Sequence, residues 1–284
     1  MSIVPNAAPR AGRDRRAGLD RRAGLDRRAG LDRRVAVAAA GFVLLGVVVY
    51  LVGLPRLLGR PAGAMVFDTE LADLTLPVAL FVALAGTSIS AAVLTRADWR
   101  VVDIVVASVL GVAGGLLFAV WNAAAWPAIS GLLPPPASAL LVGVWLLPGV
   151  LGGLVLRKPG AAVYTELVAA VLSAVIGNQW GFATVWYGLI EGLGAEVVFA
   201  LLLYRRFGAV TATLAGVGAG VTTGLMDSLL YYPQLSSAYK ISYLVFAMIS
   251  GGVIAGLGSW ALTRALARTG VLAPLASGRV AERV

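Results

Sequence analysis

Two glutamates, Glu191 and Glu196, interrupt the otherwise apolar stretch YGLIEGLGAEVVFALLLYRR at positions 187–206. Glu166 and Asp227 lie in similarly apolar surroundings. An ionised carboxylate inside a bilayer costs about 2.5 kcal/mol or more, so such a group pairs with a cation, becomes protonated or faces water. Because no lysine or arginine lies in the interior of these apolar runs, we expect a positively charged ligand to supply the missing partner.

Glu191 is the strongest candidate for this role. Tyr187 lies one helical turn before it and shares its face, and Trp180 comes just before the same predicted helix. Glu196 follows five residues after Glu191, about 140° further around the helix, and is expected to face elsewhere. It is therefore a secondary candidate for the site, together with Asp227.

The acidic residues also have a purely structural interpretation. Glu166 and Glu196 could be neutral carboxyl groups that are hydrogen-bonded inside a helix bundle. Glu166 could instead pair with Arg157 or Lys158, which follow an apolar run nearby. Asp103 lies close to the end of another run, where it is less deeply placed.

Aromatic and amide side chains recur at the same predicted depth as Glu191. An aromatic belt at the membrane interface would explain the tryptophans and tyrosines, but amides are not typical of such a belt. Stacking, cation–π attraction and hydrogen bonds from such a set suit a flat cationic heterocycle. We expect the aromatic walls and the ring-binding amides to be Trp121, Asn122, Asn178, Gln179, Trp180 and Tyr187.

The residue inventory excludes several kinds of chemistry. The chain has no histidine and no cysteine, so neither imidazole-based metal sites nor thiolate catalysis is expected, and we predict no metal or cofactor. Its two lysines do not end a GxxxxGK[ST] loop, so no ATPase of that type is present. Without a nucleophile–base pattern, we do not expect an enzyme.

The composition identifies the elements that position these residues. Of 284 residues, 59% are hydrophobic and 13% are charged, about half the charged fraction of a soluble domain. Apolar runs long enough to cross a bilayer as helices recur along the chain. The sequence therefore predicts an all-α, multi-pass protein of the cell membrane with eight spans, at 35–53, 76–95, 101–126, 138–156, 161–177, 183–204, 209–230 and 241–265.

Basic residues predict the orientation. With the N-terminus inside, 20 of the 23 lysines and arginines fall on the cytoplasmic side, as the positive-inside rule requires. Ten of them lie in the N-terminal tail, whose hexads AGRDRR and AGLDRR suggest a solvated segment that contacts anionic lipid. The net charge of +9 therefore does not indicate nucleic-acid binding. We expect a disordered tail at 1–34, a two-helix extension at 35–96, a six-helix domain at 97–268 and a cytoplasmic tail at 269–284.

Small residues form a separate pattern on the third predicted helix. Ala107, Gly111 and Gly115 are spaced by four, an arrangement that lets two helices approach closely. The stripe could serve packing within the bundle or docking of another membrane subunit.

From Trp99 onward the sequence resembles the YkoE family, the substrate-binding (S) components of energy-coupling-factor (ECF) vitamin transporters. The matching elements are WRVVDIVVASVLGV (99–112), VWN (120–122), LRKPGAAVYTELVAAV (156–171), GNQWG (177–181) and YGLIEGLGAEVVFAL (187–201). The resemblance implies a protein that captures thiamine or its hydroxymethylpyrimidine precursor near the outer face. It also implies a transmembrane coupling subunit and two ATPases as partners, and it favours the docking role of the small-residue stripe. Residues 1–96 have no counterpart in the six-helix pattern.

A proton- or cation-coupled secondary transporter is the main alternative, because buried acids can also relay protons. The lack of an evident inverted repeat weighs against it. A structural membrane subunit that binds no small molecule is a further alternative.

Overall fold

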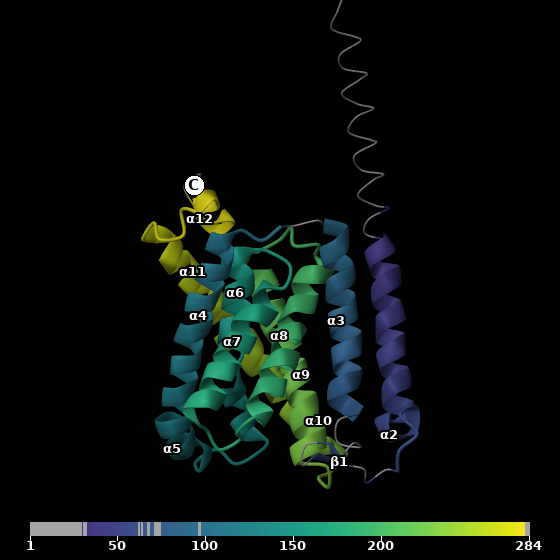
Figure 1. Ribbon diagram of the computed structural model, residues 1–284. Coiled ribbons are helices and arrows are strands. Elements are labelled where there is room, and N and C mark those ends of the chain that lie inside the picture. The colour runs from purple at the N-terminus through teal and green to yellow at the C-terminus, as the bar shows by residue number, and fades with distance from the viewer. Residues whose placement is uncertain are drawn as a thin grey trace, which may run out of the picture.

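The computed structural model describes residues 30, 33–61, 63, 65–66, 69–70, 75–95 and 98–281. Most of the predicted arginine-rich tail lies outside these residues. Figure 1 shows a bundle of roughly parallel helices, with α12 and the C-terminal end at one end and α5 and the short strand β1 at the other. The predicted all-helical membrane fold is confirmed.

Seven helices in the described ranges are long and apolar enough to cross a bilayer, and an eighth apolar helix, α7, is shorter. At 1.5 Å per residue, the 16 residues of α7 extend about 24 Å, less than the thickness of a typical hydrocarbon core. Eight spans and the direction of the termini stay predictions. The seven longer segments are Arg33–Val52, Thr75–Thr95, Val101–Ser130, Ala137–Leu156, Ala183–Leu201, Ala209–Tyr231 and Ser237–Arg268.

The N-terminal hairpin comprises the helix Arg33–Val52, the short α2 (Leu54–Leu57) and α3 (Thr75–Thr95). A two-residue ladder between β1 (Met65–Val66) and β2 (Thr69–Glu70) lies in the connection. The helix Arg33–Val52 is outermost in Figure 1, and α3 lies between it and the rest of the bundle. The hairpin therefore covers one side of the helices that follow.

The remaining bundle consists of regular helices joined to shorter irregular turns. The regular helices are α4 (Val101–Val120), α5 (Trp126–Ser130), α6 (Leu147–Leu156), α7 (Ala161–Ile176), α8 (Ala183–Leu201), α9 (Ala209–Met226), α10 (Ser237–Ser250), α11 (Gly258–Arg268) and α12 (Ala276–Ala281). A 3₁₀ turn, η2 (Ala137–Val144), precedes α6. Three π-helical turns are η1 (Trp121–Ala125), η3 (Asp227–Tyr231) and η4 (Gly251–Leu257).

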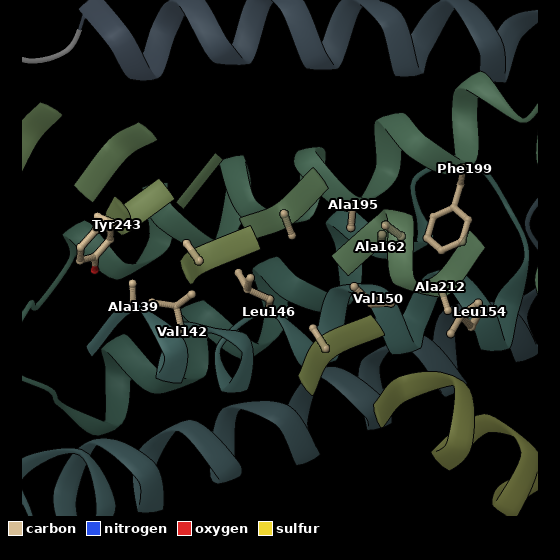
Figure 2. Packing of buried hydrophobic residues seen from close by; sticks show 14 residues of the cluster. Ala139, Val142, Leu146, Val150, Leu154, Ala162, Ala195, Phe199, Ala212 and Tyr243 are labelled. Carbon is tan, nitrogen blue, oxygen red and sulfur yellow. The ribbon is translucent and has the colours of Figure 1, made fainter. Parts of the chain in front are cut away.

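Helix α6 forms the centre of the bundle. Its sequence LPGVLGGLVL has no polar side chain, and every residue from Pro148 to Leu156 is buried. A helix that is apolar on all sides is stable where other helices surround it. The main core cluster runs along the bundle axis from Tyr243 to Phe199 and consists largely of alanine, valine and leucine (Figure 2). Small side chains let the surrounding helices approach α6 closely.

The segment after α11 folds back onto the bundle. Leu272 and Leu275 are buried against Leu151 and Val155 of α6, and the Arg100 guanidinium donates a 3.3 Å hydrogen bond to the Pro274 carbonyl oxygen. The described part of the predicted C-terminal tail is therefore packed against the rest of the protein.

Candidate functional site

A cavity of about 350 Å³ lies between the ends of the helices opposite α12. It has a size typical of small-molecule sites, which are roughly 300–1,000 Å³. Its walls come from α4, η1, α5, η2, α7, α8, α9, η3, α10 and the segments that join them. The lining residues are Phe118, Asn122, Trp126, Val142, Trp145, Glu166, Ala170, Trp180, Thr184, Tyr187, Gly188, Glu191, Thr223, Asp227, Tyr231, Tyr232 and Tyr243.

Three carboxyl groups reach this cavity, and each is held by one protein donor. The Gly149 N–H donates to Oε2 of Glu166 at 2.6 Å, the Thr223 hydroxyl donates to Oε1 of Glu191 at 2.9 Å, and the Tyr243 hydroxyl donates to Oδ2 of Asp227 at 2.7 Å. No lysine or arginine is among the described residues of the lining. Each of these groups that is ionised adds negative charge to the cavity, and no basic side chain among its described lining residues offsets that charge.

The two basic residues that could have paired with Glu166, Arg157 and Lys158, bind elsewhere. The Arg157 guanidinium donates a 3.3 Å hydrogen bond to the Leu154 carbonyl oxygen and lies over the Phe207 ring. The Lys158 ammonium donates to Oδ2 of Asp103 at 2.6 Å and also to the Asp98 carbonyl oxygen. The Arg100 guanidinium holds the other Asp103 oxygen at 2.9 Å. This cluster joins the start of α4 to the loop before α7, at the end of the bundle remote from the cavity.

Aromatic rings of the cavity lining form three groups: a tryptophan cluster, the pair Tyr187–Tyr231, and the pair Tyr232–Tyr243, whose ring centroids are 5.5 Å apart. The indole of Trp145 packs edge to face against those of Trp126 and Trp180, with centroid distances of 4.8 and 5.5 Å. Tyr187 stacks on Tyr231 with a centroid distance of 5.9 Å. Rings of both kinds can stack on a flat ligand or interact with a cation over their faces.

The π-helical turns η1 and η3 contribute directly to this wall. The extra residue in a π turn rotates the following side chains relative to a regular α-helix, and such turns often occur at functional sites. Asn122 lies in η1 and Trp126 follows it, while Asp227 and Tyr231 are the first and last residues of η3. The local irregularity of both helices therefore coincides with the cavity.

Two asparagines hold the tryptophans in place. Asn122 accepts a hydrogen bond from the Trp145 indole at 2.9 Å and donates to Ser173. Asn178 donates to Ser173, and its side-chain oxygen accepts from the backbone N–H of Trp180 and from the Thr184 hydroxyl. Both amides thus orient neighbouring parts of the site, and Asn122 also reaches the cavity.

The structure places five of the nine predicted binding residues on the cavity lining: Asn122, Trp180, Tyr187, Glu191 and Asp227. The other four lie outside it. Trp121 packs against Trp145, Asn178 supports the loop before α8, and Gln179 is exposed. Glu196 is used within the protein, where its oxygens accept from the Gly160 and Ala162 N–H groups and the Tyr204 hydroxyl.

Several lining residues were not assigned to the site from the sequence. Thr223 lies one turn before Asp227, and this spacing could have identified it. Trp145 sits in an apolar run with no polar neighbour, so its sequence context gave no comparable signal. The remaining unassigned residues are Phe118, Trp126, Val142, Glu166, Ala170, Thr184, Gly188, Tyr231, Tyr232 and Tyr243.

The predicted docking stripe faces the interior of the bundle in this structure, and its docking role stays a prediction. Ala107 is fully buried. A Cβ atom on Gly111 would lie 2.6 Å from Cβ of Val168, and one on Gly115 would lie 2.8 Å from Cβ of Leu172. Because α7 approaches Gly111 and Gly115 this closely, the small residues serve close helix packing in this structure.

The sequence and the fold are similar to those of known transport proteins. Residues 102–222 match the family described as ABC-type cobalt transport system, permease component. A protein of Bacillus subtilis (strain 168), provisionally assigned as HMP/thiamine permease protein YkoE, is 32% identical over 183 residues, which are 64% of this chain and 92% of that protein. A solved structure described as an S-component of an ECF transporter matches with a TM-score of 0.61 and 32% identity, covering 66% of this chain and 94% of the other.

These similarities, together with the helical bundle, define a multi-pass membrane transport protein and not an enzyme. The chain belongs to the YkoE family of ECF transporter S components.

Proposed function

We propose that this protein captures thiamine or its hydroxymethylpyrimidine precursor from the outer side of the membrane for an ECF-type importer. One observation carries the proposal: a cavity lined by three carboxyl groups and by indole and phenol rings, with no basic side chain among its described lining residues. Thiamine consists of a planar aminopyrimidine ring joined by a methylene group to a planar, cationic thiazolium ring, so its rings and its charge complement both features. The name of the Bacillus subtilis relative points to the same ligands.

The orientation predicted from the basic residues places this cavity at the outer face. The chain carries no nucleotide-binding loop of the Walker type, so energy for release to the cytoplasm would come from partner ATPases through a transmembrane coupling subunit. The exposed apolar faces of the bundle leave room for lipid and for such a subunit.

Calorimetry on the purified full chain tests ligand capture. We expect saturable binding of thiamine, hydroxymethylpyrimidine or both, and a thiamine affinity at least about tenfold lower in Glu191→Gln, a loss of about 1.4 kcal/mol. Glu196→Gln is the matched control, because Glu196 is also buried but is bonded within the protein. Absence of binding by the folded wild-type chain would refute the proposal.

A cation-coupled secondary transporter is the competing proposal, since three clustered carboxyl groups could also carry protons. The two functions differ in what the isolated chain can do. In proteoliposomes that contain this chain alone, a secondary transporter would accumulate thiamine when a pH gradient is applied. We expect no accumulation until the coupling subunit and ATPases are added with ATP.

A further inference from the structure

A second, smaller cavity lies where the N-terminal hairpin meets the rest of the bundle, at the end where Figure 1 shows α2 and β1. This hairpin crevice has a volume of about 220 Å³. The hairpin forms one wall, and η3 and the start of α10 form the other. Tyr50 is 47% exposed and Pro233 is also exposed, so the crevice opens to the surface of the bundle. Its lining residues are Tyr50, Thr75, Leu76, Leu229, Leu230, Pro233 and Lys240.

Lys240 brings a positive charge to this largely apolar crevice. Its ammonium donates a 2.7 Å hydrogen bond to the Pro233 carbonyl oxygen, which is a neutral acceptor. Within the part of the chain that the structure describes, Lys240 forms no ion pair, and no carboxylate lines the crevice. Lys240 is the fourth residue of α10, near a helix end whose partial positive charge adds to its own. An anionic group is therefore the complementary ligand.

An apolar helix face continues from the crevice along the first helix of the hairpin. Val47 and Val43 precede Tyr50 by three and seven residues, so the three side chains share one face of the helix Arg33–Val52. Val47 is 46% exposed and Val43 is 50% exposed. This face leads from the membrane surface toward the middle of the bilayer. A charged group at one end and an exposed apolar face below it match the shape of a phospholipid.

We propose that the hairpin crevice binds an anionic phospholipid, whose phosphate pairs with Lys240 and whose acyl chain lies along Val47 and Val43. The crevice is too small for a whole phospholipid, so it holds the headgroup end while the chains stay in the bilayer. Basic pockets between transmembrane helices bind anionic headgroups in other membrane proteins. A zwitterionic lipid carries a cation of its own, which Lys240 would repel.

The inference goes beyond vitamin capture and concerns the part of the chain that precedes the matched residues 102–222. The hairpin contributes Tyr50, Thr75 and Leu76 to the crevice. A lipid bound there would contact both the hairpin and η3 and would therefore stabilise the contact between them. The same π-helical turn contributes Asp227 and Tyr231 to the larger cavity.

Three variants separate the charge of Lys240 from its other roles. Lys240→Gln removes the charge and keeps an N–H donor for the Pro233 carbonyl oxygen. Lys240→Arg keeps the charge. Arg60→Gln is the control, because Arg60 is an exposed basic residue on the same predicted side of the membrane but does not line the crevice. Thermal unfolding of each variant checks that it is folded.

The experiment is native mass spectrometry of the purified full chain, titrated with phosphatidylglycerol or with phosphatidylcholine that has the same acyl chains. We expect the wild type to bind the first phosphatidylglycerol at least about fivefold more tightly, the factor that corresponds to about 1 kcal/mol for one basic side chain near an anionic surface. Lys240→Gln should abolish this preference, whereas Lys240→Arg and Arg60→Gln should keep it. Hydrogen exchange locates the lipid: phosphatidylglycerol should slow exchange in residues 228–240 of the wild type but not of Lys240→Gln.

The proposal is refuted if the wild type does not prefer phosphatidylglycerol, or if Arg60→Gln loses the preference as fully as Lys240→Gln. Glycerol 3-phosphate distinguishes a lipid from a free phosphate. If it slows exchange in residues 228–240 as strongly as phosphatidylglycerol does, the crevice is a phosphate site and the lipid proposal fails. Should Lys240→Gln not fold, the lipid preference and the exchange pattern of the wild type decide. No measurement here uses thiamine, so this inference and vitamin capture can fail independently.

Discussion

The indole Nε1 of Trp145 donates a 2.9 Å hydrogen bond to the side-chain oxygen of Asn122, a residue 23 positions earlier in the chain. This bond joins the end of the 3₁₀ turn η2, which precedes α6, to the π-helical turn η1 at the end of α4. Because Trp145 also packs between Trp126 and Trp180, one amide fixes the orientation of the ring that connects the aromatic cluster.

Replacing Asn122 with leucine should therefore weaken both stability and ligand binding. The buried indole N–H would lose its acceptor, which costs about 1–3 kcal/mol, and Ser173 would lose a donor. We expect a lower unfolding temperature and a thiamine affinity reduced by about tenfold. Thermal unfolding and calorimetry in the same detergent measure these effects.

Gln179→Ala is the comparison for this variant. Gln179 precedes Trp180 in the same loop, but its side chain is exposed and does not line the cavity. We expect unchanged affinity and stability. A clear loss of thiamine binding in Gln179→Ala would instead support the direct contact that the sequence predicted.

Glu196 should be a determinant of stability and not of ligand recognition. Glu196→Ala removes the acceptor for two backbone N–H groups and the Tyr204 hydroxyl, so we expect one of the larger losses of stability among single substitutions, at least about 3 kcal/mol. Tyr204→Phe removes one of these bonds and should cost less. Chemical unfolding in detergent gives the order of the two effects. Equal stability of Glu196→Ala and the wild type would contradict the role assigned to this carboxylate.

The contact between α9 and η4 should not accept even one methyl group. A Cβ atom on Gly216 would overlap with the carbonyl oxygen of Gly251, and the reverse holds for Gly251. Gly216→Ala is therefore expected to reduce the yield of folded protein strongly, as measured by gel filtration and thermal unfolding. For Gly258, no described heavy atom lies within 4 Å of the added Cβ. Gly258→Ala should leave stability unchanged or increase it by up to about 1 kcal/mol.

The N-terminal hairpin should depend on a close approach between Gly86 of α3 and Phe42. A side chain at position 86 would overlap with the Phe42 ring, so Gly86→Leu should separate the helix Arg33–Val52 from α3. We expect faster proteolysis of the first helix and a lower unfolding temperature. Gly41→Leu is the control on that helix, since no described atom lies within 4 Å of its Cβ position. Equal proteolysis of the two variants would argue against this packing.

The same variant tests whether the hairpin supports the binding site. Leu76, Leu80 and Leu84 of α3 pack against a buried cluster that includes Ile190 and Met226. Tyr187, which lines the cavity, packs against the same cluster. If α3 moves together with the outer helix, thiamine affinity should fall in Gly86→Leu but not in Gly41→Leu. Equal affinity in both would limit the hairpin to a role in stability.

The sequence alone determined the class of fold. Each apolar run is long enough to cross the bilayer, and backbone groups without hydrogen bonds are unstable in lipid, so these runs must be helices. The sequence also located acidic residues inside the apolar runs, and helical spacing placed Tyr187 and Glu191 on the same helix face. The tertiary structure decided which acids face the cavity. Glu166 and Glu196 have equivalent sequence contexts, and only the packing of α6, α7 and α8 gives Glu196 three donors and leaves one oxygen of Glu166 without a described partner. Hydrogen bonds between helices depend on rotation and distance between segments far apart in the chain, and a single sequence does not encode these in any local pattern.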